Sequence, residues 1–285
     1  MTSPTPKASA ILAVYNAATT VAPALDSLLA QSVPTEIIVV DDGSTDGTVD
    51  ILKKYRGRVR LVRQHHGGPA VARNLGARFA TSPILLFVDA DMTFDSDYVR
   101  DLITPILESR ISNLTSILGT YTTDERVANW DNVWARSWNW QEGWEDGKRF
   151  PPHAPKWGTD FRAILKSEFD RVGGFDSIGY TDTWTLFQKL QARPLATHAI
   201  CYHQNPGTLP AVWRQARWVA KRPYKFGVIG ALYALARTSL PVSLAVGMYK
   251  SFLHAEIRFL LFKVVYDVGR FVGILELLSA KKRYN

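Results

Sequence analysis

Short apolar runs recur along the first 120 residues of the chain, at residues 10–14, 37–40, 59–62 and 84–88. The second and fourth runs contain no alternating polar positions. This pattern is typical of strands that are covered on both faces in a parallel sheet. The runs therefore predict four strands of a largely buried sheet.

Helix-like stretches separate these runs. Val21, Leu25 and Leu28 fall on one helical face, residues 49–52 repeat the pattern less cleanly, and residues 70–80 follow a Gly-Gly-Pro start signal. Alternating strands and helices predict an α/β fold with a mostly parallel central sheet and right-handed crossovers. Further strand and helix signals lie at residues 163–165, 183–190 and 195–201.

A tryptophan-rich segment interrupts the alternation between residues 124 and 156. Trp130, Trp134 and Trp138 are spaced by four, so one helical face is expected to carry all three. Two interpretations remain open at this stage. The rings pack in a core, or they form an aromatic surface that faces a sugar or a membrane interface.

The C-terminal part of the chain is strongly apolar. Residues 226–249 are apolar apart from Arg237 and contain a helix-breaking Pro241, and residues 251–280 form an amphipathic pattern with a polar stripe. We therefore expect a catalytic domain over residues 1–222 and membrane-associated helices over residues 223–285. A helix lying in the membrane interface is the simplest interpretation; a transmembrane pair and a soluble helical cap are the alternatives.

The charge distribution supports a membrane partner. The chain carries a net charge of +8, but residues 210–285 alone hold 13 Lys and Arg against 3 Asp and Glu. All of the excess positive charge thus accompanies the most apolar stretches, as expected for contact with an anionic membrane surface. Nucleic acid is not expected as a partner, because aliphatic residues separate the basic ones and no binding motif occurs.

Two acidic clusters follow predicted strands: Asp41-Asp42 and Asp89-Ala90-Asp91. Ligands of open α/β sheets bind outside the carboxyl ends of the strands. A divalent cation held by one or two carboxylates and by phosphate oxygens neutralises a departing diphosphate. The second cluster therefore predicts a site for Mn²⁺ or Mg²⁺ and a nucleoside diphosphate.

Five motifs occur together in one order: Tyr15-Asn16, Val39-Val40-Asp41-Asp42-Gly43-Ser44, Gly68-Pro69-Ala70-Val71-Ala72-Arg73-Asn74-Leu75-Gly76, Val88-Asp89-Ala90-Asp91 and Val172-Gly173-Gly174-Phe175-Asp176. In this order the chain resembles family 2 glycosyltransferases over roughly residues 8–205. These are inverting enzymes of the GT-A fold, related to polyprenyl-phosphate sugar synthases and to cellulose synthase. The resemblance implies a GT-A nucleotide-sugar-binding domain.

The resemblance also implies roles for individual residues. The residues that would line the base and ribose of the donor are Ala13, Tyr15, Asp41 and Arg73, with Asp42 near them. Asp91 would be the main metal ligand, and Asp89 would contact ribose or metal. Asp182 matches the catalytic base, which takes the proton of an attacking hydroxyl. His203, after the last strand, is a candidate for metal or diphosphate binding, and an ordinary hydrogen-bonded histidine is the alternative.

Three positions depart from the family pattern. Ala13 replaces the usual proline, and Thr181 replaces an acidic residue before the base. The Gln-x-x-Arg-Trp motif of processive synthases is displaced by one residue in the run 214–218, which favours transfer of a single sugar. Arg217 and Trp218 remain candidates for diphosphate and acceptor contacts.

Together these features predict a membrane-associated, inverting, metal-dependent glycosyltransferase at the cytoplasmic face of the cell membrane. It would move one sugar from a nucleotide-sugar donor, GDP-mannose ahead of UDP-hexoses, to a lipid-linked glycan. Direct glycosylation of a polyprenyl phosphate and a non-catalytic nucleotide-sugar binding module are the alternatives. A sugar-phosphate nucleotidyltransferase is disfavoured, because residues 15–18 lack the glycine-rich basic loop that it needs.

Overall fold

The computed structural model describes residues 5–112, 117–144, 147–151, 155–178, 182–222 and 224–281. The chain divides into two compact units. Unit 1 comprises Met1–Ala128 and Phe150–His203, and unit 2 comprises Asn129–Arg149 and Gln204–Asn285. This division differs from the expected boundary after residue 222, because residues 204–222 and the tryptophan-rich segment pack with the C-terminal helices.

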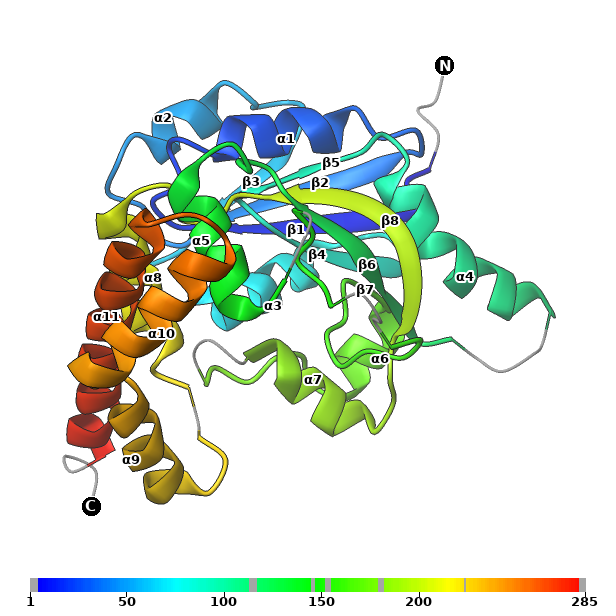
Figure 1. Ribbon diagram of the computed structural model, residues 1–285. Helices are drawn as coiled ribbons and strands as arrows, with labels where there is room; N and C mark the ends of the chain where they lie inside the picture. Colours follow the sequence, from blue (N-terminus) through cyan, green and yellow to red (C-terminus); the bar gives the residue numbers. More distant parts are fainter. Residues whose placement is uncertain are drawn as a thin grey trace. The chain divides into compact units, whose positions relative to one another are not determined.

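Unit 1 is built on an eight-stranded sheet with the order β3-β2-β1-β4-β7-β6-β8-β5 (Figure 1). The strands are β1 (Ala8–Val14), β2 (Thr35–Asp41), β3 (Arg60–Arg63), β4 (Ile84–Asp89), β5 (Met92–Phe94), β6 (Gly119–Val127), β7 (Ala163–Leu165) and β8 (Leu195–His203). Strands β3, β2, β1 and β4 are parallel to one another, as are β6 and β8. The β4–β7, β7–β6 and β8–β5 pairs are antiparallel, so the expected mostly parallel sheet is in fact mixed.

Helices cover both faces of this sheet (Figure 1). They are α1 (Val21–Leu29), α2 (Thr48–Lys53), α3 (Pro69–Phe79), α4 (Tyr98–Ser112), α6 (Lys166–Arg171) and α7 (Asp182–Leu190). Leu12 of β1 packs in a core with residues of α1 and α4, whereas Ile11 packs in a second core with residues of α3 and α7. A strand that is buried on both faces needs apolar residues at successive positions, which explains the unbroken apolar runs.

One glycine sets the distance between α3 and the sheet. A Cβ atom on Gly76 would lie 2.5 Å from Cγ2 of Ile11. The absence of a side chain thus allows α3 to lie directly on β1 and β2, so that its N-terminal half comes close to the ends of these strands.

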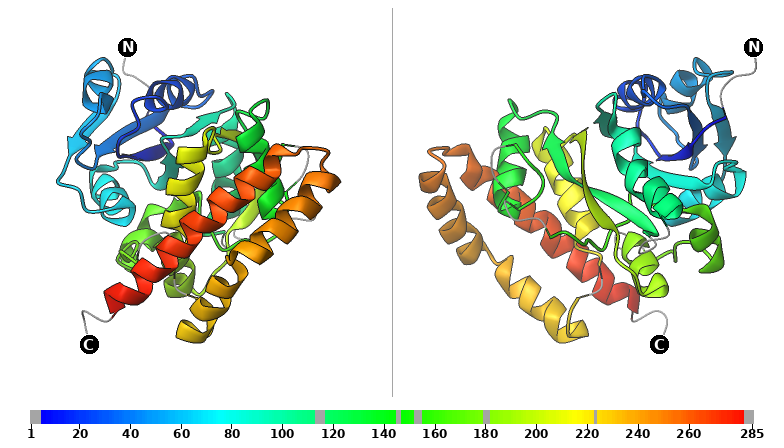
Figure 2. Two further views of the ribbon diagram at one scale, coloured as in Figure 1. Left: turned by 60° about the vertical axis from the view of Figure 1, so that its left-hand side comes forward. Right: turned by 90° about the vertical axis from the view of Figure 1, so that its right-hand side faces the viewer.

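Unit 2 is helical. It contains α5 (Val133–Glu142), α8 (Leu209–Val219), α9 (Gly227–Arg237), α10 (Leu240–Leu253) and α11 (Arg258–Lys281). Within this unit α11 lies between α8 and α10 (Figure 2). Trp138 packs in the core against Phe259 and Tyr266. Trp130 precedes α5, so the expectation that one helix carries all three spaced tryptophans is wrong, and Trp138 is a core residue.

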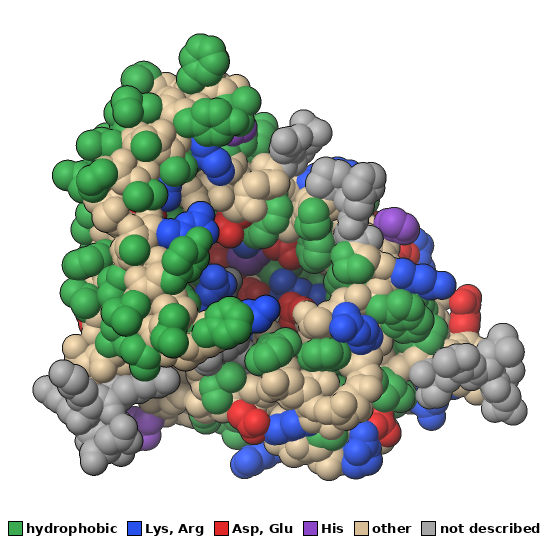
Figure 3. Space-filling view, turned by 60° about the horizontal axis from the view of Figure 1, so that its bottom comes forward, with side chains coloured by type: hydrophobic (Ala, Val, Ile, Leu, Met, Phe, Trp, Pro, Cys, Tyr) green, Lys and Arg blue, Asp and Glu red, His purple; other side chains and the backbone are tan. Residues whose placement is uncertain are grey.

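The C-terminal helices turn their polar stripe inward. Lys263 and Asp267 are buried within unit 2, whereas apolar side chains of α9, α10 and α11 lie on the surface (Figure 3). The chain breaks between α9 and α10 close to Pro241, as expected. In the described part of the chain, no individual helix has the length and apolar content of a membrane span; α9 and α10 meet this test only as a pair, bent by 61°.

Candidate active site

The carboxyl ends of four parallel strands meet at one edge of the unit 1 sheet. The register places Ala13 beside both Val40 and Asp89, and places Asp41 beside both Val14 and Arg63. Three residues expected at the donor site, Ala13, Asp41 and Asp89, thus come from adjacent strand ends. This edge is where an α/β sheet binds its ligand.

Asp41 and Asp42 organise the loops at this edge. The buried Asp41 carboxylate accepts a hydrogen bond from the Ser44 backbone N–H at 3.1 Å and pairs with Arg63 Nε at 3.0 Å. Asp42 accepts from the backbone N–H groups of Gly67 and Gly68, at 2.8 and 2.9 Å. The two carboxylates therefore already have protein partners: Asp41 fixes the loop that follows β2, and Asp42 fixes the backbone that leads into α3.

An aromatic pair lies on the same loops. The rings of Tyr15 and His66 stack with centroids 4.1 Å apart, and His66 Nδ1 lies 2.9 Å from an Asp42 carboxylate oxygen. The Tyr15 side chain is exposed, as the face of a base- or sugar-binding ring must be. His66 could not be placed here from the sequence, because it lies in a loop without a recognisable ligand spacing.

Two arginines hold Asp89. Arg73 Nη2 of α3 donates to Asp89 Oδ1 at 2.7 Å, and Arg162 Nη1 donates to Oδ2 at 3.1 Å. Burial by itself raises the pKa of Asp89, but the positive charges of Arg73 and Arg162 outweigh it and hold this pKa well below its usual value. Asp89 is therefore a carboxylate whose two oxygens are both engaged by guanidinium groups.

Arg162 extends this contact to a second carboxylate and a histidine. Its Nη2 donates to Glu125 Oε2 at 3.3 Å. The other oxygen of Glu125 lies 2.8 Å from His203 Nδ1, and His203 Nε2 lies 3.1 Å from Asp91 Oδ2. Asp91 and His203 meet because β5 pairs with β8 in a register that sets Met92 opposite His203. Asp89 and Asp91 are two residues apart, yet they have different surroundings.

Asp91 and His203 suit a divalent cation. Two neighbouring ligands of a six-coordinate Mg²⁺, each about 2.1 Å from it, lie about 3 Å apart, close to the observed separation. The carboxylate on the far nitrogen of His203 is the arrangement commonly found behind a metal-binding histidine. No cluster of three or more His, Cys, Asp or Glu suited to a metal occurs among the described residues. A cation that takes one or two protein ligands completes its shell with phosphate oxygens and water.

Three expected residues remain: Asp182, Arg217 and Trp218. Helix α7 begins at Asp182, but the Asp182 side chain and residues 179–181 lie outside the described residues. Arg217 belongs to α8 of unit 2, where its Nε donates to Glu276 Oε2 at 3.1 Å. Trp218, also of unit 2, has a partly exposed ring.

Arg162 and Glu125 are the site residues that sequence reasoning missed. Glu125 lies in β6, a strand whose sequence contains many polar residues and no apolar run, and Arg162 lies just before β7 without any motif around it. Only the pairing of β6 with β7 and β8 brings the two side chains to the acidic pair.

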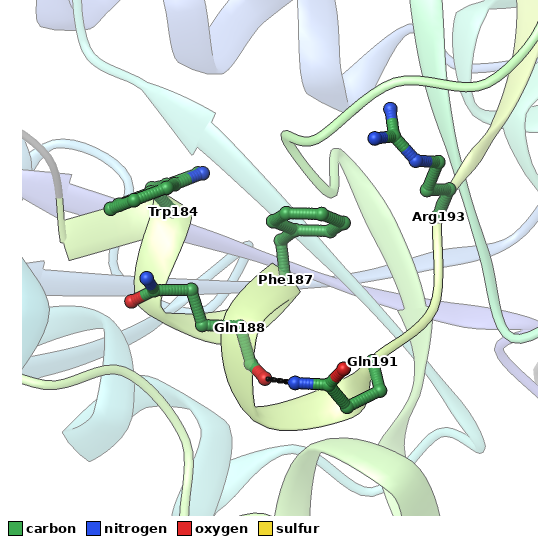
Figure 4. Close-up of a pocket in the computed structure, with 5 residues that line it drawn as sticks. All are labelled: Trp184, Phe187, Gln188, Gln191 and Arg193. Carbon is green, nitrogen blue, oxygen red and sulfur yellow. Dashed lines mark hydrogen bonds between the residues drawn. The ribbon is translucent and has the colours of Figure 1, made fainter.

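A separate surface pocket lies on α7 (Figure 4). It has a volume of about 380 Å³ and is lined by Trp184, Phe187, Gln188, Gln191 and Arg193. Arg193 lies over the Phe187 ring at 5.2 Å. None of the acidic residues described above lines this pocket, so we assign the site to the strand ends.

Comparison with known proteins agrees with this site. Residues 9–168 match a family model described as Glycosyl transferase family 2. The uncharacterized glycosyltransferase YibD of Escherichia coli (strain K12) is 39% identical over 112 residues, which are 38% of this chain and 33% of YibD. Such matches cover a third or less of the curated relatives' own length.

Two solved structures are similar over nearly the whole chain. The mannosyltransferase PcManGT of Pyrobaculum calidifontis, in complex with GDP-Man and Mn²⁺, has a TM-score of 0.56 and 19% identity, covering 97% of this chain and 88% of that one. Residues 1–349 of Staphylococcus aureus TarS, in complex with UDP-GlcNAc, have a TM-score of 0.52 and 16% identity, covering 96% and 92%. At these identities the similarity shows a common GT-A-like fold.

Proposed function

Because the chain belongs to glycosyl transferase family 2, we propose that it moves one sugar from a nucleoside-diphosphate sugar to a lipid-linked glycan, with inversion at the anomeric carbon. The observation that carries this proposal is the group at the strand ends. There Asp89 is fixed by two arginines, while Asp91 is exposed beside His203. Nucleotide binding and metal binding would thus fall to different members of the acidic pair.

The donor would lie across the ends of β1, β2 and β4. The exposed Tyr15 ring provides a face for the base, and the Asp89 carboxylate, fixed by Arg73 and Arg162, provides acceptors for ribose hydroxyls. We place GDP-mannose ahead of UDP-hexoses. This order rests on the resemblance to polyprenyl mannosyltransferases, since the neighbour PcManGT is in complex with GDP-Man and the neighbour TarS with UDP-GlcNAc.

Asp91 and His203 would hold Mn²⁺ or Mg²⁺. A cation bound there supplies a positive charge that stabilises the departing diphosphate. The protein's own part is to present a carboxylate and an imidazole nitrogen 3.1 Å apart, and to hold that imidazole from behind through Glu125.

Asp182 would act as the base at the start of α7. It would take the proton of an acceptor hydroxyl as the oxygen attacks from the side opposite the diphosphate. A polyprenyl phosphate is already ionised and needs no such base. Retention of Asp182 therefore favours a sugar hydroxyl on a lipid-linked glycan as the acceptor.

A thermal-shift panel tests donor binding. We expect GDP-mannose with Mn²⁺ to raise the melting temperature more than UDP-glucose or UDP-GlcNAc does, and we expect slow donor hydrolysis under the same conditions. Stabilisation without hydrolysis would identify a binding module. No stabilisation by any donor in the presence of Mn²⁺ would contradict the proposal.

Substitution of the base tests the acceptor class. Asp182→Asn should nearly abolish transfer to a polyprenyl-linked sugar while donor stabilisation persists. Asp170→Asn, which removes an exposed carboxylate of α6 paired with Lys166, is the matched control and should transfer normally. Transfer by Asp182→Asn at close to the wild-type rate would show that the base or the hydroxyl acceptor is assigned wrongly.

Unit 2 would attach the enzyme to the cytoplasmic face of the cell membrane. Large apolar side chains of α9 and α10 are exposed, among them Ile229 at 75% and Phe252 at 89%. Basic residues accompany them, which suits a surface that lies in an anionic interface. Attachment there would bring the enzyme to a lipid-linked acceptor.

A further inference from the structure

The acidic pair, an arginine, a glutamate and a histidine form one continuous series of contacts in unit 1. The series runs from Asp89 through Arg162 and Glu125 to His203 and ends at Asp91, with successive separations of 3.1, 3.3, 2.8 and 3.1 Å. The members that the sequence predicted as donor or metal contacts are its two ends, Asp89 and Asp91, and His203. Arg162 and Glu125 in the middle were not among the expected donor or metal contacts.

The middle of the series is enclosed, whereas its Asp91 end is open. The side chains of Glu125 and Arg162 are 7% and 16% exposed, and that of Asp91 is 45% exposed. Burying a carboxylate and a guanidinium costs free energy that their mutual attraction often only just repays. An apolar pair could fill the same volume, so stability alone does not account for charges at these positions.

Glu125 has a definite effect on His203. A carboxylate beside Nδ1 accepts a hydrogen bond from the Nδ1–H group and fixes both the orientation of the ring and the nitrogen that faces outward. The nitrogen left to face Asp91 is Nε2. Arg162 in turn donates hydrogen bonds to both Glu125 and Asp89. Asp89 therefore remains paired with arginines, and Asp91 is the carboxylate that can bind the cation.

We propose that Glu125, anchored by Arg162, is a positioning residue that fixes His203 as a nitrogen ligand for the divalent cation beside Asp91. The inference rests on the proposed metal-dependent function. It adds that the site prefers Mn²⁺ to Mg²⁺, because Mg²⁺ favours oxygen ligands while an imidazole nitrogen binds transition metals more readily.

The test is Mn²⁺ binding to the full chain, in the presence of GDP and in parallel of UDP, followed by electron paramagnetic resonance. The wild-type protein should bind Mn²⁺ and show electron spin-echo modulation from a coordinated ¹⁴N. Glu125→Gln should weaken Mn²⁺ binding by about 10- to 100-fold, the usual range for loss of a carboxylate behind a metal-bound histidine, and diminish the ¹⁴N signal. Binding of the nucleotide without metal should not change.

Two further variants separate positioning from folding. His203→Asn should remove the ¹⁴N signal and bring the affinities for Mn²⁺ and Mg²⁺ closer together. Glu168→Gln makes the same chemical change on α6, where Glu168 pairs with Arg171, and should leave Mn²⁺ binding unaltered. If Glu125→Gln does not fold, Glu125→Asp, which keeps the charge but draws the carboxylate back from His203 Nδ1, takes its place and should weaken Mn²⁺ binding and the ¹⁴N signal in the same direction.

Each outcome has one meaning. Wild-type protein that binds Mn²⁺ without a ¹⁴N signal, or a folded Glu125→Gln variant that binds Mn²⁺ like the wild type, overturns the inference and leaves metal dependence intact. Wild-type protein that binds no Mn²⁺ with either nucleotide contradicts the metal-dependent function itself, and the inference falls with it.

Discussion

Each unit removes charged side chains from water, and the two sets are built differently. In unit 1 the series that begins at Asp89 ends on Asp91, whose side chain is 45% exposed. In unit 2 Lys263 and Asp267 pair at 2.7 Å on successive turns of α11, with side chains 7% and 2% exposed. Ser243 of α10 donates to the same Asp267 carboxylate at 2.7 Å.

The difference separates two uses of buried charge. A series that runs from the interior to solvent ends on a carboxylate that solvent can reach, and a ligand can bind to that carboxylate. A closed pair leads to no exposed group, and the hydrogen bond from Ser243 of α10 to Asp267 of α11 fixes how these two helices lie against each other. Loss of a charge should therefore affect binding in unit 1 and folding in unit 2.

The largest effect is expected at the open end in unit 1. Asp91→Asn removes the exposed carboxylate that would hold the cation, so donor turnover should fall by about 10³-fold, as expected from the loss of several kcal/mol of charge stabilisation. The free energy of unfolding should change by less than about 0.5 kcal/mol, as for other exposed positions. Steady-state kinetics measures the turnover, and urea denaturation measures the free energy of unfolding. A variant with normal turnover would contradict the assignment of metal binding to Asp91.

The closed pair in unit 2 should respond in the opposite way. Asp267→Asn leaves Lys263 charged and buried without its partner, which should lower the free energy of unfolding by about 3–5 kcal/mol in urea denaturation. Replacement of both residues, Lys263→Met with Asp267→Leu, should restore most of this loss because neither charge of the pair is then buried without its partner. A double variant as unstable as the single one would show that an unpaired buried charge is not the cause of the loss.

The sequence predicted unit 1 more fully than unit 2, for a physical reason. Strands covered on both faces need continuous apolar runs, so β1, β2 and β4 were apparent, and β7 was found with its bounds at Ala163–Leu165. Strand β6 was missed, because Thr120 and Thr122 are buried there and donate their hydroxyls to backbone carbonyls. In unit 2 a periodicity shows two faces of a helix, but cannot show which of them turns inward, and the polar stripe of α11 proved to be the buried side.

The candidate site also contains residues that the sequence predicts and residues that it does not. Asp41, Asp89 and Asp91 follow strands and could be read from the chain, and Arg73 came with the family resemblance. Arg162 and Glu125 could not, because their proximity depends on which strands pair after β4. Local sequence carries no information about that order.

The exposed apolar surface of unit 2 offers a third test. Ile229→Glu with Phe252→Glu removes two of its most exposed apolar side chains and should lower co-sedimentation with vesicles that contain anionic lipid by at least about tenfold, since burial of each would contribute about 1.5–3 kcal/mol. The free energy of unfolding should change by less than about 0.5 kcal/mol. Val71→Glu on unit 1 is the control. Unchanged sedimentation of the double variant would exclude this surface from membrane contact.

The smallest effect concerns an ion pair that is open to solvent. Hydrogen bonds from Arg217 and Lys221 lower the pKa of Glu276 to about 2, from its usual 4.5. A carboxyl whose pKa is lower in the folded state stabilises that state above its ordinary pKa, and this contribution is lost as the pH falls from about 4.5 towards 2.

Glu276→Gln should therefore lower the free energy of unfolding at pH 7 and match the wild type near pH 2. The difference should stay below about 1 kcal/mol, because the Glu276 side chain is 34% exposed and solvent screens the pair. Urea denaturation between pH 2 and pH 7 measures it, and 1 M salt should shrink it. The variant also releases Arg217. If Arg217 contacts the donor diphosphate, as the family resemblance implies, donor affinity should rise slightly in Glu276→Gln and fall in Arg217→Ala. Wild-type donor affinity in both variants would show that Arg217 does not contact the donor and serves only in its ion pair with Glu276.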